Sequence, residues 1–284
     1  MKTKIPFDEL YKYSDLPEKL LSNKKAITKV KSHEEVIREF EREKWRNLLG
    51  HLKTKPDIDI VGINKILMPE NDAPIVSLIN NSFYLTKPNL IEKEHINIYS
   101  KILSKYIDNS DALVELGAGY GSKILTLSNI KSFSKLNLFA GELTVSGQRL
   151  IKLISQNMGK KISVGFCDFR TLNFSKLDIP ENSIIFSSYA AHYVPYLKDQ
   201  YVEKILQLKP RIVVHFEPLY EIQTKKTIFE SMCKKYIEIN DYNRNLYSLL
   251  VKAQKNKKIE LKIKKNVIGS NPFLPISIIE WSPK

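Results

Sequence analysis

One stretch carries most of the information about the fold of this 284-residue chain: Ala112-Leu-Val-Glu-Leu-Gly-Ala-Gly-Tyr-Gly121. It begins as a short apolar run, which is typical of a buried strand, and it ends in three glycines at alternate positions. Glycine is needed where the backbone turns tightly or lies close to a ligand. The next residues, 122–128, have the pattern of a helix, and the free N–H groups of a helix N-terminus attract negative charge. The stretch therefore predicts a strand, a ligand-binding turn and a helix.

Short apolar runs alternate with helical stretches from residue 111 onward. The predicted strands are 112–116, 136–140, 162–166, 183–187, 211–216, 259–263 and 277–281, and the predicted helices are 122–128, 146–156, 196–207 and 225–236. This alternation favours a mostly parallel sheet with helices on both faces. No helix separates the last two runs, so these two strands should pair antiparallel. We therefore expect an α/β fold with a seven-stranded, mostly parallel sheet and an antiparallel last strand.

The glycine turn can be compared with two kinds of cofactor-binding loop. A dinucleotide-binding loop has the pattern Gly-x-Gly-x-x-Gly and would place its third glycine where Ser122 stands. An acid followed by Gly-x-Gly-x-Gly is matched in full by Glu115, Gly117, Gly119 and Gly121. On these residues the sequence resembles the class I S-adenosylmethionine-dependent methyltransferases.

The resemblance covers roughly residues 86–284 and implies a Rossmann-like methyltransferase sheet that binds S-adenosyl-L-methionine and releases S-adenosyl-L-homocysteine. In that family the acid before the loop, here Glu115, lies near the ammonium group of the cofactor. An acid at the end of the next strand, here Glu142, accepts hydrogen bonds from the ribose hydroxyls, and a third acid, here Asp168, lies beside the adenine. The cofactor-binding residues implied are Glu115, Gly117, Ala118, Gly119, Gly121, Glu142, Leu143, Asp168, Phe169 and Ser188. A helix-terminal acid at Glu142 and an ordinary loop acid at Asp168 stay open as alternatives.

The reaction chemistry is expected where the fourth and fifth predicted strands end, because open α/β sheets bind ligands beyond the carboxyl ends of their strands. The resemblance makes those two strands neighbours, so four side chains should converge on one cleft: His192, Tyr193, His215 and Glu217. His192 is the first candidate for a base that removes a proton from an acceptor hydroxyl, because imidazole titrates near neutral pH. Glu217 would orient this histidine or bind a substrate donor. A structural histidine is an open alternative at both positions, more strongly at His215.

Two further segments are candidates for binding the acceptor. Arg244 follows Asp241-Tyr-Asn and suits a phosphate or a carboxylate, with a plain surface turn as the alternative. Tyr11 and Tyr13 lie in residues 7–13, which would fold over the cleft as a lid, with simple packing as the alternative.

The N-terminal part of the chain is rich in charged residues and is expected to be helical. Its clearest helix is 32–49, which Ser32 can cap together with Glu35 as a capping box. We therefore divide the chain into a helical N-terminal extension or lid, residues 1–85, and a methyltransferase domain, residues 86–284.

The formal net charge of +14 raises nucleic acid, a membrane surface or an anionic substrate as partners. Of the 45 basic residues 38 are lysines, whereas proteins that recognise base sequence rely on the arginine fork. The Asn/Asp-Pro-Pro-aromatic motif of enzymes that methylate base amino groups is also replaced here, by Ser187-Ser-Tyr-Ala190. Nucleic acid is therefore disfavoured as a partner. The positive charge is better explained by basic residues around a site for an anionic acceptor.

Several other classes of protein are disfavoured as well. Cys167 and Cys233 stand far apart, so neither a disulfide framework nor a cysteine zinc site is expected, and no clustered carboxylates suggest a metal. The first ten residues carry charges where a signal peptide needs an apolar run, and no stretch approaches about 18 consecutive apolar residues. We expect a cytoplasmic protein without a membrane segment, either a monomer or a homodimer.

The function expected first is O-methylation of a small polar or anionic acceptor, such as a phosphorylated, nucleotide-linked or glycan-linked metabolite. The alternatives are N-methylation of a peptide or amine in natural-product tailoring, RNA methylation, and a non-catalytic scaffold that only binds the cofactor. Residues 271–281 are similar to those of bacterial methyltransferases, and we expect a bacterial tailoring enzyme.

Overall fold

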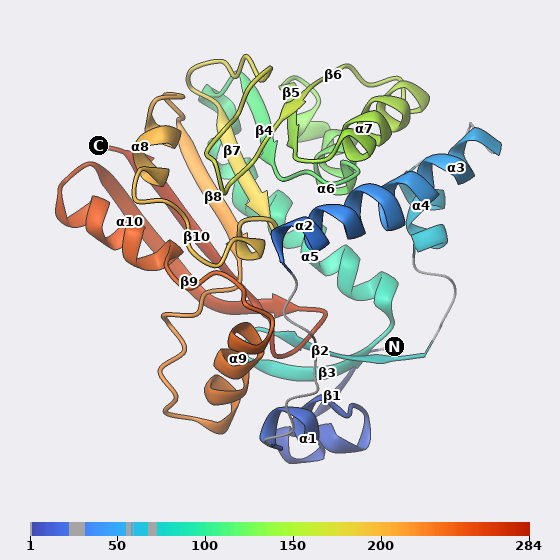
Figure 1. The fold of residues 1–284 in the computed structure, drawn as a ribbon, viewed down its shortest axis with the longest axis vertical. Helices are drawn as coiled ribbons and strands as arrows, with labels where there is room; N and C mark the ends of the chain where they lie inside the picture. The colour runs from blue at the N-terminus through green and yellow to red at the C-terminus, as the bar shows by residue number, and fades with distance from the viewer. Residues whose placement is uncertain (1, 23–31, 55–57, 59, 68–72) are drawn as a thin grey trace.

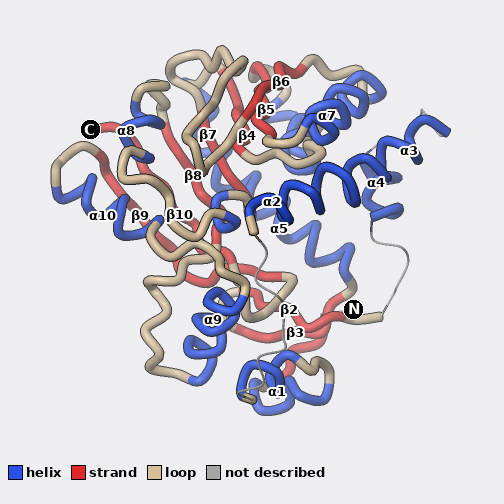
Figure 2. The backbone as a smooth tube through the Cα atoms, viewed as in Figure 1, coloured by secondary structure: helices blue, strands red, loops and turns tan. Residues whose placement is uncertain are grey.

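The structure is a computed structural model that describes residues 2–22, 32–54, 58, 60–67 and 73–284. Its centre is one mixed sheet with the strand order β1-β3-β2-β9-β10-β8-β7-β4-β5-β6 (Figures 1 and 2). The strands in the described part of the chain are β1 (Lys2–Ile5), β2 (Ile75–Ile79), β3 (Ser82–Thr86), β4 (Ala112–Leu116), β5 (Asn137–Glu142), β6 (Ile162–Phe166), β7 (Ile184–Ser188), β8 (Ile212–Glu217), β9 (Ile259–Gly269) and β10 (Ile276–Pro283).

Helices cover both faces of this sheet. The α-helices described are α1 (Leu16–Leu21), α2 (His33–Arg38), α3 (Arg46–Thr54), α4 (Ile60–Leu67), α5 (Pro88–Leu103), α6 (Ser122–Ser128), α7 (Val145–Asn157), α8 (Tyr201–Leu206), α9 (Ile228–Ile239) and α10 (Leu246–Lys255). Short 3-10 turns are η1 (Phe7–Lys12), η3 (Ser104–Asn109), η4 (Lys131–Phe133) and η5 (Ala191–Tyr193), and a π-helical segment, η2 (Glu39–Trp45), joins α2 to α3. None of the helices described is both long enough and apolar enough to cross a lipid bilayer.

The predicted parallel core is confirmed. β4 pairs parallel with β5 and β7, β5 with β6, and β7 with β8, while β10 runs antiparallel between β8 and β9. Alternate side chains of β4 enter different apolar layers: Leu113 packs with residues of α5, α6 and α7, whereas Val114 packs with residues of α8 and α10. A strand buried on both faces must be apolar throughout, which explains its continuous apolar run.

The sheet has ten strands instead of the expected seven, because the N-terminal part of the chain contributes β1, β2 and β3. β2 and β3 form a hairpin whose turn, Asn80-Asn81, has positive φ at both residues (46° and 60°). Asparagine tolerates this backbone better than most residues, and the turn matches the twist of paired strands. β2 also pairs with β9, and β3 extends to Thr86, so the N-terminal part contains strands of the main sheet besides the expected helices.

The segment from α2 to α3 was predicted as one helix, and its start is confirmed. Glu35 N donates to Ser32 Oγ at 3.1 Å, and Ser32 N donates to Glu35 Oε2 at 2.8 Å, which completes the capping box. The segment packs against α7, beside the carboxyl ends of the parallel strands (Figure 1). Glu41 fixes it there, because its two carboxylate oxygens accept from the N–H group and the hydroxyl of Ser146 at 2.9 and 2.6 Å.

Leu78 in β2 tests whether the N-terminal strands belong to the cooperative fold. Its side chain is fully buried, so Leu78→Ala should lower the free energy of unfolding by about 2–5 kcal/mol in urea denaturation. The matched control is Leu21→Ala, because Leu21 is 64% exposed and its truncation should change stability little. An unchanged unfolding midpoint for Leu78→Ala would mean that the hairpin contributes nothing to the stability of the sheet.

Candidate active site

A cavity of about 320 Å³ lies at the carboxyl ends of the parallel strands. The loops after β4, β5, β6 and β7 form one side of it, and α2 with η2 forms the other. This cavity is called the first cavity below. Nine of the ten cofactor residues implied by the sequence line it: Glu115, Gly117, Ala118, Gly119, Glu142, Leu143, Asp168, Phe169 and Ser188. The tenth, Gly121, precedes the first residue of α6 and supports the turn from outside the cavity.

The three glycines of the turn all have positive φ, between 60° and 83°, which disfavours any residue with a side chain. A Cβ on Gly117 would collide with the Cβ of Ala190 in the loop after β7. A Cβ on Gly119 would lie 3.3 Å from the indole ring of Trp45. The glycines therefore allow two other segments, the β7 loop and η2, to close around the cavity.

Glu142 at the end of β5 holds the site together. Its Oε2 accepts from Gly119 N at 2.9 Å, and its Oε1 accepts from the N–H group and the hydroxyl of Thr144 at 2.9 and 2.6 Å. Burial raises the pKa of this carboxyl, although these hydrogen bonds oppose the shift. Thr144 also caps α7, so Glu142 is more than a helix-terminal acid: it joins the glycine turn to the start of α7.

Glu115 lies in the wall of the first cavity with few partners of its own. Its side chain is buried, it makes no ion pair with any described residue, and its Oε2 accepts from Ile124 N at 3.0 Å. Burial raises the pKa of this carboxyl to about 8, and the Ile124 hydrogen bond lowers it only in part. The carboxyl is therefore largely protonated at pH 7, and a cation bound in the cavity would favour its ionised form.

Asp168 lies at the start of the loop after β6, where its oxygens accept from Arg170 N at 2.8 Å and Thr171 Oγ1 at 2.7 Å. These bonds are those of a loop acid that stabilises its own turn. The residue nevertheless lines the first cavity together with Phe169, whose ring lies close to Gly117.

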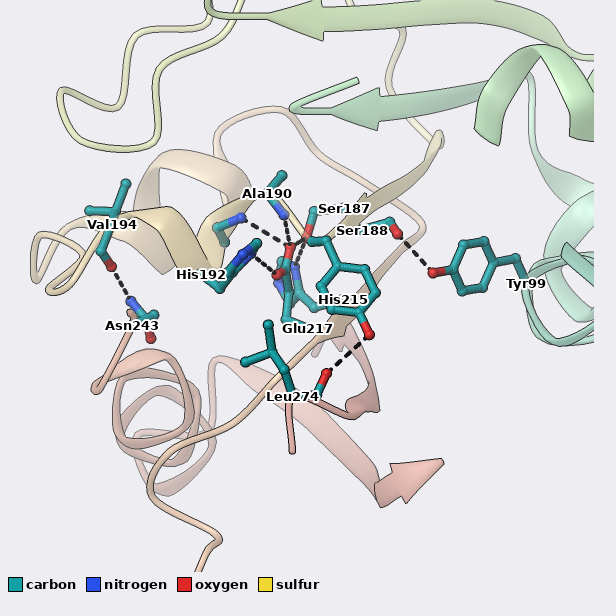
Figure 3. Close-up of polar contacts among 12 residues, drawn as sticks. Tyr99, Ser187, Ser188, Ala190, His192, Val194, His215, Glu217, Asn243 and Leu274 are labelled. Atoms are coloured by element: carbon teal, nitrogen blue, oxygen red, sulfur yellow. Dashed lines mark hydrogen bonds and ion pairs between the residues drawn. The ribbon is translucent and has the colours of Figure 1, made fainter. Parts of the chain in front are cut away.

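His192 and Glu217 form a buried pair at the ends of β7 and β8 (Figure 3). His192 lies in η5, is 3% exposed, and places its Nδ1 3.4 Å from Oε2 of Glu217. The other oxygen of Glu217 accepts from Ser187 Oγ at 2.8 Å and from the N–H groups of Ala190 and Ala191 at 2.9 and 3.0 Å. Burial favours the neutral acid, but the His192 contact and these hydrogen bonds outweigh it and lower the pKa of Glu217.

His215 belongs to the same network but lies deeper. Its Nε2 accepts from Trp281 Nε1 at 3.0 Å, which leaves the proton on Nδ1, 3.0 Å from Ser187 Oγ. Burial lowers the pKa of His215 to about 4, so the ring is neutral at pH 7. His215 lines neither the first cavity nor the larger one beside it. Its contacts are those of a structural histidine rather than a catalytic one.

A second cavity, of about 890 Å³, adjoins the first, since His33, Val36, Tyr193 and Val194 line both. Tyr193 thus lies where the sequence placed it, at the site. His192 lines neither cavity, and its ring packs on that of Tyr193 with the centroids 4.1 Å apart.

The predicted acceptor residues lie apart from the cavity walls. Arg244 pairs with Asp241, and its guanidinium lies 5.5 Å from the ring centre of Tyr196; both of these partners line the second cavity, whereas Arg244 does not. Tyr11 lines a separate hollow beside α1 and is 66% exposed, and Tyr13 is 47% exposed and lines neither cavity of the site. η1 packs on β3 through Phe7, so it does not reach the cleft.

The residues that cover the first cavity come from α2 and η2, and the sequence pattern does not identify them as site residues. They are His33, Val36, Ile37, Phe40 and Trp45. The Nε1 group of Trp45 is buried without a hydrogen-bond partner. The apolar face of the predicted helix indicates that these side chains are buried, but it does not identify the surface that they pack against.

Neither a protein-family model nor a curated protein matches this sequence. Among solved structures, the chain is similar to the small RNA methyltransferase HEN1, with 15% identity over 70% of this chain and 26% of that chain and a TM-score of 0.48. It thus spans about a quarter of that protein. It is also similar to a magnesium protoporphyrin IX methyltransferase from Synechocystis with bound S-adenosylhomocysteine (12% identity, 68% and 85% coverage, TM-score 0.47) and to a geranyl diphosphate C-methyltransferase from Streptomyces coelicolor (8%, 66% and 80%, TM-score 0.46).

No group of three or more His, Cys, Asp or Glu side chains in the described ranges could hold a metal ion.

Glu217→Gln tests whether the network holds an ionised carboxylate. A carboxyl whose pKa is lowered by folding stabilises the protein above its unfolded pKa, near 4.5, and loses this contribution as the pH falls through the folded value. We expect the variant to be less stable than the wild type at neutral pH by about 1.5–3 kcal/mol, and the difference to shrink below pH 4.5 in urea titrations. Glu203→Gln, at an exposed ion pair, is the matched control. A stability difference that does not depend on pH would show that Glu217 is not ionised in the folded protein.

Proposed function

We propose that this protein is an S-adenosylmethionine-dependent methyltransferase. One observation carries the proposal: three acids that end the successive strands β4, β5 and β6, or follow them directly, line a single cavity beside the glycine turn. These acids are Glu115, Glu142 and Asp168. Carboxylates there can accept from an ammonium group, a pair of hydroxyls and an amino group, which are the donors that this cofactor carries.

The cavity fits the cofactor in charge as well as in position. Glu115, which makes no ion pair with a described residue, would ionise and pair with the ammonium group of the amino-acid end. Glu142 would accept from the ribose hydroxyls, and Asp168 with Phe169 would hold the adenine. The aromatic rings of Phe40 and Trp45 in the cover suit a ligand with a positive sulfonium.

The bound cofactor would supply a methyl group on a sulfonium, which an acceptor oxygen takes as the electron pair of the carbon–sulfur bond returns to sulfur. The protein's own tasks are to align the acceptor and to remove the hydroxyl proton. His192 is the candidate base, because its Nδ1 faces an ionised carboxylate and its Nε2 makes no hydrogen bond to a described residue. Glu217 would stabilise the imidazolium that forms when Nε2 takes the proton.

The O-methylation of a small polar or anionic acceptor is the form of the reaction that this pair supports. A hydroxyl needs a base during transfer, and the His192–Glu217 pair is the one buried His–carboxylate pair among the ion pairs described. Tyr193, whose ring packs on that of His192, lines both cavities, so the pair lies beside the wall that the cavities share.

Calorimetry with S-adenosylmethionine and S-adenosylhomocysteine tests whether the protein binds this cofactor and whether the carboxyl of Glu115 takes part in binding. The ammonium group favours the ionised carboxyl, so below its pKa of about 8 this group must release a proton when the ligand binds. The dissociation constant should therefore fall by about tenfold from about pH 6 to about pH 7, with the release of about one proton. In Glu115→Gln, which resembles the protonated acid in shape, binding should be weaker and independent of pH. Binding of NAD without binding of either sulfur compound would contradict the proposal.

If His192 is the base, its neutral ring must carry the proton on Nδ1, so that Nε2 is free to accept one. Long-range proton–nitrogen NMR correlations distinguish the two tautomers of a histidine. We expect the Nδ1–H form for His192, facing Glu217, and also for His215, whose Nε2 accepts from Trp281. The exposed His51 serves as a reference in the same spectrum. An Nε2–H form of His192 would remove it as the base.

A further inference from the structure

The second cavity lies beside the first, and the two share part of their walls. The shared residues are His33, Val36, Tyr193 and Val194. A molecule in the second cavity would therefore lie next to whatever occupies the first. With a volume of about 890 Å³, the second cavity is large enough for a small-molecule ligand.

Tyrosine rings dominate the wall of the second cavity: Tyr193, Tyr196, Tyr236 and Tyr242. Three of them form a connected group, since the ring centres of Tyr193 and Tyr242 are 5.6 Å apart at 81°, and those of Tyr236 and Tyr242 are 6.5 Å apart. Aromatic walls of this kind favour a flat ring that can pack edge-on or face-on against them.

The hydroxyls of Tyr193 and Tyr242 are available to a ligand. Neither makes a hydrogen bond to any residue that the structure describes, although each side chain is largely buried. Burial raises the pKa of Tyr193 to about 12 and raises that of Tyr242 as well, so both hydroxyls keep their protons and can donate. A ligand oxygen placed between them would be recognised by two neutral donors.

The charged groups around the cavity leave one positive charge without an ion pair. Lys44 pairs with Glu39 at 2.8 Å, and Arg244 pairs with Asp241. Arg170 has no ion pair with a described residue, and the oxygens of nearby Asp168 already accept from Arg170 N and Thr171. Burial and the charge of Arg170 lower the pKa of His33, which leaves that ring neutral at pH 7. An anionic group on a ligand would therefore be attracted to Arg170.

We propose that the second cavity binds the methyl acceptor, and that this acceptor is an aromatic ring carrying a hydroxyl and an anionic group. The anionic group would pair with Arg170, the ring would pack among the tyrosines, and the hydroxyl would lie toward Tyr193 and the first cavity. This inference rests on the proposed methyltransferase function, because it makes the second cavity the acceptor site of that reaction.

Three probes separate the features of this ligand: 4-hydroxybenzoate, its neutral isostere 4-hydroxybenzamide, and glucose 6-phosphate as an anion without an aromatic ring. Their dissociation constants are measured by ligand-observed NMR on the full chain, with and without saturating S-adenosylhomocysteine. We expect 4-hydroxybenzoate to bind about tenfold more tightly than the amide, which is the size typical of a charge-assisted hydrogen bond. Glucose 6-phosphate should bind more weakly than 4-hydroxybenzoate.

Arg170→Gln should abolish the preference for the acid over the amide, whereas Arg42→Gln, an exposed arginine outside both cavities, should preserve it. Tyr242→Phe removes a hydroxyl that has no partner in the described chain, so it should leave the fold intact and weaken the binding of both phenols several-fold. Stronger binding of glucose 6-phosphate, or an acid preference that survives Arg170→Gln, would overturn the inference. Calorimetry with S-adenosylhomocysteine reports separately on the proposed function, so a failure of cofactor binding is distinguishable from a failure of acceptor recognition.

Discussion

The parallel pairing of β4 with β5 and β7 is the constraint on which the site depends. Parallel strands end at the same edge of the sheet, so the acids and glycines that follow them meet there although they are far apart in sequence. Glu142 converts this proximity into a fixed geometry, because one carboxylate accepts from both the glycine turn and the start of α7. The cavity is therefore a consequence of strand order, and one buried side chain holds its walls in place.

A second constraint comes from the buried charge on Glu217. A carboxylate without solvent needs donors, and here the donors are Ser187 and two backbone N–H groups, while Nδ1 of His192 lies 3.4 Å from the second oxygen. Ser187 contacts His215 (Figure 3), and His215 in turn accepts from Trp281 in β10, so the antiparallel last strand supports the loop after β7. The network explains why polar side chains occur in strands that are otherwise apolar.

The N-terminal part of the chain has two separate roles. β1, β2 and β3 lengthen the sheet beyond β9, where β2 pairs with Ile268 and Gly269 at the end of that strand (Figure 1). The segment from α2 to α3 instead covers the first cavity, fixed by Glu41 and lined by Phe40 and Trp45. Residues 7–13 were the expected lid, but they pack on the strands, and a helix further along the chain takes that place.

The parallel core, the glycine turn and the acids around it can be predicted from the sequence, because each depends on local chemistry: apolar runs, left-handed glycines, and carboxylates at strand ends. The capping box of α2 is equally local and was predicted from two residues, Ser32 and Glu35. Three features depend instead on how the chain packs in space: β2 adds to β9, Trp45 lies over Gly119, and Arg170 lies beside a wall of tyrosines. Those contacts join segments distant in the chain, and an apolar or charged side chain does not reveal from sequence alone which surface it will meet.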